Sequence, residues 1–213
     1  MIVRRTKRAN VKLPRKGIRL RDFPYWRLIV VSTLLERDGL VARWRRINPN
    51  MESGLQDPFE LDVGGEAVPH PHPSARRQIV LTDAYCQITE QIGHVAAMAV
   101  AVATPSFGIR IPDVVWMPPD DWEGIDRDTP VPFVPALCVE VLLDRDNPND
   151  IDLRVRAYLK GGAREVIVVD KHGQVEFWGA SGLQQASTFG ITLSLDRMYF
   201  DEPARLSFPK VRC

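Results

Sequence analysis

The sequence predicts a mixed α/β fold, in which a sheet with both parallel and antiparallel strands is flanked by helices. From residue 74 onward, segments with helical and strand character alternate in the order α-β-β-β-α-β-β. Three consecutive strands between two helices are typical of a sheet with a helix on each side. The 213 residues, 45% hydrophobic and 26% charged, suit a globular domain with a real core and exclude a collagen or a disulfide-built scaffold.

Positive charge is concentrated at the start of the chain. Residues 1–46 hold 14 Lys or Arg and three acids, a net charge of +11, whereas the remainder carries −10. Such a segment resists packing and is suited to contact with nucleic-acid phosphates, although a solvated tail is the alternative. The residues expected to bind nucleic acid are Arg4, Arg5, Lys7, Arg8, Lys12, Arg15 and Lys16. We therefore divide the chain into a basic arm over residues 1–50 and a second domain over 51–213.

Residues 26–47 allow two interpretations. The β-branched run from Leu28, the Asp38-Gly39 turn and the segment Leu40–Trp44 favour a β-hairpin. A helix that ends at Gly39 is the alternative. We take the hairpin as the prediction for this end of the arm.

The segments that follow are assigned by periodicity and by turn residues. A strand is expected over residues 59–63, before the Gly64-Gly65 turn. His70 and His72 are each followed by proline, and a loop with exposed imidazoles is favoured over a metal site. The later expected elements are a helix over 74–92, strands over 94–103, 109–117 and 136–143, a helix over 151–159, and strands over 165–170 and 174–178.

Two acidic residues lie within apolar strand segments. Asp113 follows Pro112 in the 109–117 segment, and Glu140 lies in the run Leu137–Leu142. A carboxylate buried in a strand is costly unless it is paired or binds a metal. Because most of the 27 residues between the two acids are loop, their strands can be neighbours and can bring both carboxylates to one hard cation such as Mg²⁺. A solvent-facing Glu140 and a turn-capping Asp113 are the alternative.

The cysteines and the apolar stretches indicate the compartment. Cys86, Cys138 and Cys213 form no C-x-x-C pair, which argues against a zinc ribbon, and we expect Cys86 and Cys138 to be small buried hydrophobes. No apolar stretch approaches the ~20 residues of a membrane-spanning helix. We therefore expect a cytoplasmic protein that has no membrane partner.

Three ordered motifs resemble a known family. They are Ile111-Pro-Asp-Val-Val-Trp116, Pro135-Ala-Leu-Cys-Val-Glu-Val-Leu142, and the segment Tyr158–Asp170, with Phe59-Glu60-Leu61-Asp62 upstream. This series is similar to the Uma family of restriction-endonuclease-like bacterial proteins, which belongs to the PD-(D/E)XK nuclease-like superfamily. The resemblance covers roughly residues 59–179 and implies a restriction-endonuclease-like fold.

The resemblance implies a metal-dependent endonuclease that hydrolyses DNA phosphodiester bonds with Mg²⁺ or Mn²⁺. Asp113 and Glu140 match the family's metal ligands, and Glu60 matches an upstream acid that completes the metal shell. Arg154 falls on the family's lysine position, four residues before Tyr158. The implied partner is nucleic acid, DNA in the first place, and a homodimer is left open.

Two departures from the family bear on activity. Arg154 replaces the lysine, and since guanidinium stays protonated it cannot accept a proton, although it can hold a phosphate or a water. The segment Leu143-Asp-Arg-Asp146 replaces the family's Ser-Pro-Ser-type turn. An exposed Arg154 that only neutralises Asp150, at i,i+4, is an equal alternative. Two functions are therefore carried forward: an attenuated endonuclease, and an inactive nucleic-acid-binding or interaction module on the same fold.

Overall fold

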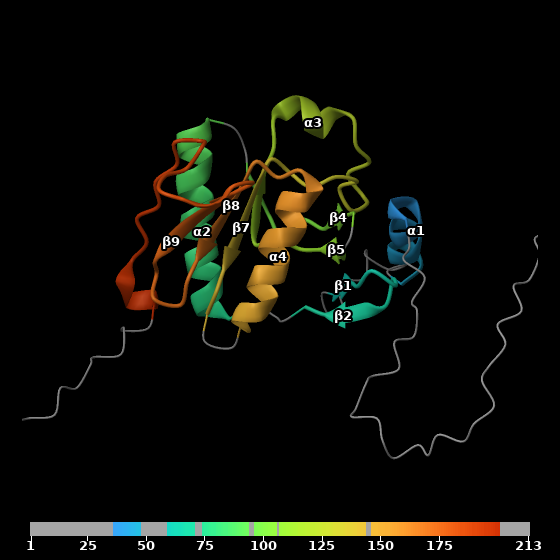
Figure 1. Ribbon diagram of the computed structural model, residues 1–213, viewed down its shortest axis with the longest axis horizontal. Coiled ribbons are helices and arrows are strands. Elements are labelled where there is room, and N and C mark those ends of the chain that lie inside the picture. Colours follow the sequence, from blue (N-terminus) through green and yellow to red (C-terminus); the bar gives the residue numbers. More distant parts are fainter. Residues whose placement is uncertain are drawn as a thin grey trace, which may run out of the picture. The chain divides into compact units, whose positions relative to one another are not determined.

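The computed structural model describes residues 36–47, 59–70, 74–93, 96–105, 107–143 and 146–200. Within these ranges the chain forms two sheets and four α-helices, and the expected fold class, a mixed sheet flanked by helices, is confirmed (Figure 1). The seven basic residues expected to bind nucleic acid lie outside the described residues, as do residues 26–35 of the expected hairpin and His72.

The larger sheet has six strands in the order β10-β9-β8-β7-β6-β3. Only the β7–β8 pair among them is parallel. Alternate residues of β7 face opposite sides of this sheet: Cys138 packs in a core cluster with residues of α4, whereas Val139 and Val141 pack with residues of α2. The two helices thus cover opposite faces (Figure 1). The strand bounds are β3 Ala97–Met98, β6 Val114–Trp116, β7 Leu137–Val141, β8 Glu165–Val169, β9 Val175–Gly179 and β10 Gly182–Gln184.

Both covering helices begin at a capping side chain and end at a glycine with positive φ. The Ser74 hydroxyl accepts a hydrogen bond from the backbone N–H of Arg77 at the start of α2 (Ala75–Ile92), and Gly93 ends the helix with φ of 77°. Asn147 caps α4 (Pro148–Gly161) in the same way, and Gly162 ends it with φ of 108°. These starts and stops confirm the helices expected over 74–92 and 151–159.

Two expected strands are each split between the two sheets. The segment 94–103 contributes β3 to the six-stranded sheet and β4 (Val102–Thr104) to a four-stranded sheet with the order β2-β1-β5-β4. The segment 109–117 likewise gives β5 (Gly108–Arg110) and then β6. The first break lies at Ala99, whose φ is 53°, and the second at Pro112, which has no N–H to continue a ladder. The continuous strands expected there are therefore wrong, and Asp113 stands where the chain changes sheets.

The smaller sheet carries α1 (Arg37–Ile47) on its surface. Leu40 and Trp44 are buried in one cluster with Leu61, Ile109 and Ile111. Since residues four apart lie on one helix face, both side chains reach the sheet together, and Trp44 contacts Phe59 at 4.7 Å between ring centroids. The strand expected over Leu40–Trp44 is wrong, and so is the helix ending at Gly39. The remaining strands are β1 Phe59–Leu61 and β2 Ala67–Pro69, and short helices lie at α3 Pro119–Glu123 and η2 Arg197–Tyr199.

Gly108 allows β5 to approach β1 closely. Its φ is +83°, and a Cβ atom placed there would overlap the carbonyl oxygen of Leu61. We expect Gly108→Ala to lower the free energy of unfolding by about 2 kcal/mol or more, because strain and overlap add. Chemical denaturation measures this. Gly124→Ala is the matched control, since no atom lies within 4 Å of the added methyl group; an equal effect in the two variants would contradict the close approach.

Two further expectations can be compared with the structure. Cys138 is buried as expected, but Cys86 is exposed, because it lies off the α2 face formed by Val80, Ala84 and Ile88. In the part of the chain that the structure describes, no helix combines the length and apolar character needed to cross a membrane.

Candidate active site

Asp113 and Glu140 come from adjacent strands of the larger sheet. In the antiparallel β6–β7 pair Val114 stands opposite Val139, so Asp113, which directly precedes β6, lies beside the part of β7 that carries Glu140. The Asp113 N–H donates to the Val139 carbonyl at 3.0 Å, which holds Asp113 against β7. Both side chains are nearly buried, with 5% and 3% of their surface exposed. The expected adjacency of the two strands is confirmed, and the charge of Asp113 acts on Glu140.

Glu140 is held from the α4 side of the sheet. The buried hydroxyl of Tyr158 donates to Glu140 Oε1 at 2.6 Å, and Arg154 Nη1 lies 3.4 Å from the same oxygen. Burial raises the pKa of Glu140 to about 8; Arg154 opposes the rise, and the charges of Asp113 and Glu60 add to it. At neutral pH this carboxyl therefore keeps its proton, chiefly because it is buried.

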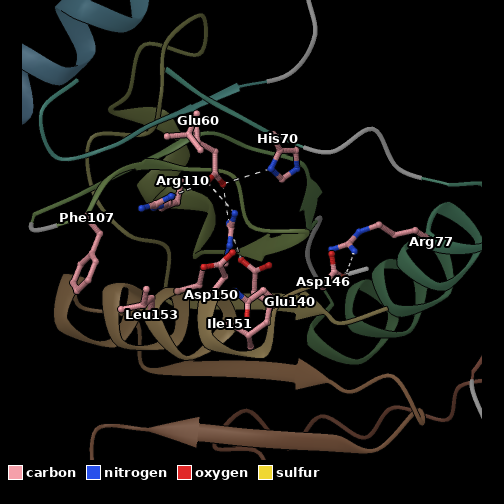
Figure 2. Close-up of a pocket in the computed structure, with 13 residues that line it drawn as sticks. Glu60, His70, Arg77, Phe107, Arg110, Glu140, Asp146, Asp150, Ile151 and Leu153 are labelled. Atoms are coloured by element: carbon pink, nitrogen blue, oxygen red, sulfur yellow. Dashed lines mark hydrogen bonds and ion pairs between the residues drawn. The ribbon is translucent and has the colours of Figure 1, made fainter. Parts of the chain in front are cut away.

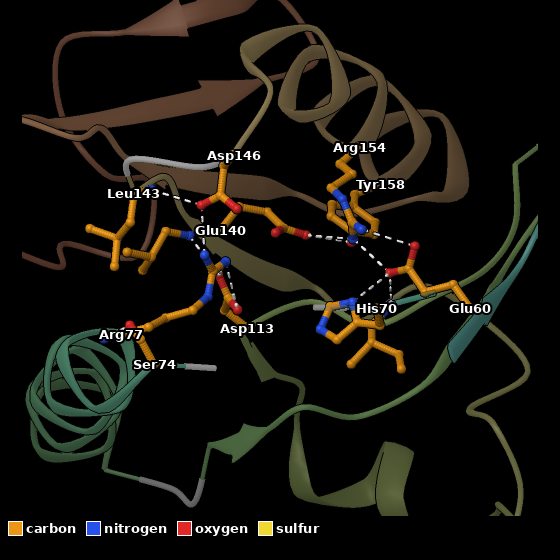
Figure 3. A network of polar contacts seen from close by, with 12 residues as sticks. Glu60, His70, Ser74, Arg77, Asp113, Glu140, Leu143, Asp146, Arg154 and Tyr158 are labelled. Atoms are coloured by element: carbon orange, nitrogen blue, oxygen red, sulfur yellow. Dashed lines mark hydrogen bonds and ion pairs between the residues drawn. The ribbon is translucent and has the colours of Figure 1, made fainter. Parts of the chain in front are cut away.

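Asp113 is held by an arginine from α2. Arg77 Nη2 lies 2.9 Å from Asp113 Oδ2, and the Val141 N–H donates to the same oxygen at 2.7 Å. The other nitrogen of Arg77, Nη1, donates to Asp146 at 2.6 Å. Burial raises the pKa of Asp113 despite the opposing effects of Arg77 and the Val141 N–H. Arg77 thus bridges Asp113 and the turn that follows β7 (Figure 3).

Glu60 comes from the other sheet and is surrounded by donors. Arg154 binds it in bidentate fashion, with Nη1–Oε1 at 2.8 Å and Nη2–Oε2 at 2.9 Å. Arg110, opposite it on β5, and the Ile111 N–H each donate at 2.9 Å. Burial opposes ionisation, but the contact with His70 and the charges of Arg154 and Arg110 outweigh it and lower the pKa of Glu60 to about 2. Glu60 is therefore a permanent anion that fixes two guanidinium groups.

Arg154 lies inside the site rather than on the surface. Only 16% of its side chain is exposed, and it connects Glu60 with Glu140 and Tyr158 (Figure 3). Its contacts are with these three residues rather than with Asp150, which is exposed. Although burial lowers the pKa of Arg154, the negative charges around it raise the value further, so the guanidinium stays protonated throughout the accessible range.

A cavity of about 410 Å³ opens beside these groups. Figure 2 shows Glu60, Arg110 and Glu140 around it, and Asp150 at its α4 wall. His70 also lines it, 3.6 Å from Glu60 and with 19% of its side chain exposed, so the exposed imidazole expected there is wrong. Asp113 does not line this cavity. Arg77, which is hydrogen-bonded to both Asp113 and Asp146, does line it, and so does Asp146.

The fit of a divalent cation can be judged from the donors. In the described ranges no three Asp, Glu, His or Cys side chains are arranged to hold a metal ion. Mg²⁺ in proteins often uses only one or two carboxylates, with waters and substrate phosphates as the other ligands. Asp113 and Glu140, on neighbouring strands, are two carboxylates with hard oxygen donors of the kind that Mg²⁺ prefers. By donor type the two residues suit the ion; that they hold it, and that Glu60 completes the shell, stay predictions.

The raised pKa of Glu140 makes the stability of the metal-free protein depend on pH. The ordinary pKa is 4.5 and the folded value is about 8, so the stabilisation is complete below the first and is lost as pH rises through the second. Glu60 has the opposite sign, but its pKa of about 2 matters only in acid. We expect the unfolding temperature in EDTA to fall between about pH 5.5 and 8.5, and less so in Glu140→Gln. Equal slopes in the two proteins would contradict this assignment.

Sequence reasoning missed four members of the network: Arg77, Arg110, Asp146 and the hydrogen-bonding role of Tyr158. The sequence did contain one sign that Arg77 has a structural role. Arg76 and Arg77 stand in the first turn of α2, where the helix dipole disfavours positive charge. Arginines at such a position indicate partners elsewhere in the fold. The cross-strand position of Arg110 depended on the sheet change at Pro112, which the sequence did not show.

The model of the Uma2 family, described as "Putative restriction endonuclease", matches residues 51–198. Among solved structures, the chain is similar to a "putative nuclease belonging to DUF820 from Anabaena variabilis ATCC 29413", with 12% identity and a TM-score of 0.48, over 73% of this chain and 91% of that one. No curated protein matches the chain.

Proposed function

Because this chain belongs to the Uma2 family, described as "Putative restriction endonuclease", we propose that it is a Mg²⁺-dependent endonuclease that hydrolyses DNA phosphodiester bonds. Membership supports a nuclease acting on nucleic acid. The metal, the preference for DNA and the residue roles are our proposals. The observation that carries them is that Asp113 and Glu140 come from adjacent strands, at the point where the chain passes between its sheets.

Asp113 and Glu140 are the proposed metal ligands. A bound Mg²⁺ or Mn²⁺ supplies Lewis-acid polarisation of the phosphoryl oxygen and activates water. Because its pKa is raised, Glu140 is protonated at neutral pH and would have to lose this proton to bind the ion. The Tyr158 hydroxyl, which donates to Oε1, would then orient the carboxylate. For Asp113 to bind it, Arg77 must release one oxygen, and Asp146 offers Arg77 a second carboxylate to remain on.

Arg154 is the proposed phosphate-orienting group. Glu60 fixes its guanidinium through two parallel bonds, so the fork is held without substrate. Being always protonated, Arg154 stabilises the charge that develops on the phosphate and does not act as a general base. Because Arg154 stands where the family has a lysine, we expect slower cleavage than in an enzyme that keeps the lysine.

Nicking of supercoiled plasmid by the full chain tests the proposal. We expect cleavage with Mg²⁺ or Mn²⁺ and none in EDTA. Cleavage that is equal in EDTA would contradict metal dependence, and absence of cleavage with either ion, on DNA and on RNA, would contradict the enzyme.

One observation favours the second candidate, an inactive nucleic-acid-binding module. Arg77 and Arg154 already place positive charge beside all three carboxylates, which is what a metal ion would otherwise supply. On that account Arg154→Lys would create Mg²⁺-dependent nicking in a protein that has none. The endonuclease proposal instead expects the wild-type chain to cleave before any substitution.

A further inference from the structure

The cavity beside the carboxylates has an apolar end that the proposed hydrolysis leaves without a role. Phe107, Leu153 and Val68 line it together with the charged residues. Leu153 and Val68 are large hydrophobic residues left 47% and 37% exposed. In the view of Figure 2, Phe107 and Leu153 lie at the end away from Arg77 and Asp146. The cavity therefore offers an apolar wall and a charged wall to the same ligand.

The cavity lining also holds two arginines that share Glu60 as a partner. Glu60 carries one negative charge but binds two guanidinium groups, those of Arg110 and Arg154. Both arginines line the cavity and keep 22% and 16% of their side chains exposed. A ligand that suits this arrangement combines a flat apolar part with a negatively charged part.

The size of the cavity narrows the class of ligand. A volume of about 410 Å³ lies in the range of sites for single small molecules. A base inside a duplex is stacked on its neighbours and cannot present its face to a protein side chain, whereas an unpaired base can stack on an aromatic ring. A nucleotide has the required composition: a planar base joined through its sugar to a phosphate.

We propose that this cavity binds one unpaired nucleotide next to the scissile phosphate, with its base on Phe107 and Leu153 and its phosphate toward Arg110. The favoured substrate is then single-stranded nucleic acid rather than an uninterrupted duplex. This inference rests on the proposed nuclease function, because that function places a phosphodiester beside Glu140.

Binding without divalent metal tests the subsite separately from cleavage. The probe is a short DNA single strand that contains one fluorescent aminopurine, compared with its duplex and with the full chain as the protein. We expect the wild type to prefer the single strand and to quench the aminopurine on binding. Phe107→Leu keeps the apolar volume but removes the ring, and should weaken single-strand binding by about tenfold and abolish the quench.

Two variants control for folding and for the surface. Phe107→Tyr keeps the ring and should bind like the wild type, and Leu183→Ala, which changes a residue 60% exposed on β10, should also do so. The subsite is overturned if the wild type does not bind the single strand, if it binds the duplex as tightly, or if Phe107→Leu binds unchanged.

The subsite and the enzyme fail in different ways. Quenching that depends on Phe107 in a chain that cleaves neither plasmid nor single-stranded nucleic acid with Mg²⁺ would keep the subsite and contradict the nuclease. Duplex nicking that is unchanged in Phe107→Leu, without single-strand preference, would keep the nuclease and contradict the subsite.

Discussion

Glu140→Gln is expected to lower Mg²⁺-dependent cleavage by about a hundredfold or more, because an ion held by two carboxylates contributes several kcal/mol to the barrier and one of the two is then neutral. Glutamine keeps the shape of the side chain and can keep the contact with the Tyr158 hydroxyl. Asp113→Asn should have a similar effect, since its carboxylate is the other proposed ligand. Initial rates of plasmid nicking measure both.

Glu90→Gln is the matched control for this series. It makes the same chemical change on the exposed side of α2, away from the carboxylates. Its nicking rate should equal that of the wild type. Wild-type rates in both Glu140→Gln and Asp113→Asn would remove the proposed site, and an equal loss in Glu90→Gln would show that the effect is not local.

Arg154→Ala is expected to lower the free energy of unfolding by about 3–5 kcal/mol, because it leaves the buried Glu60 with an uncompensated part of its charge. Glu60 is 2% exposed and loses two hydrogen bonds at once. Arg110 and the Ile111 N–H remain, and they set the upper limit of the loss. Denaturant unfolding by circular dichroism measures the change.

A second substitution separates charge from packing. Glu60→Gln added to Arg154→Ala should recover part of the lost stability, since the unpaired charge is removed. Arg156→Ala is the control on the same helix; its side chain is 70% exposed and lies 4.0 Å from Asp152, so its effect should stay within about 0.5 kcal/mol. A loss below about 1 kcal/mol in Arg154→Ala, or no recovery in the double variant, would contradict the role of the ion pair.

The sequence predicted the parts of the fold that local chemistry determines. Helix α2 begins at the Ser74 cap and ends at Gly93, and β7 and β8 are short apolar runs bounded by turns. Asp113 and Glu140 stood out because a carboxylate in an apolar strand needs a partner. Each of these signals lies within a few residues of the element that it predicts.

The rest depended on contacts that span the chain. Leu40 and Trp44 fit a strand as well as a helix until the smaller sheet is there to bury both on one face. A positive φ at Ala99 is not written in its apolar surroundings, so the change of sheet could not be expected. The partner of Arg77 lies 36 residues away at Asp113, and that of Arg154 lies 94 residues away at Glu60. Such pairs follow from the fold and not from spacing.

A structure determined after soaking crystals in Mn²⁺ tests the central claim most directly, because the anomalous signal locates the ion without reference to activity. The account predicts one ion between Asp113 and Glu140, with Arg77 retained on Asp146 and Arg154 retained on Glu60. A fully soaked crystal with no ion at these two carboxylates, and with Arg77 still on Asp113, would contradict it.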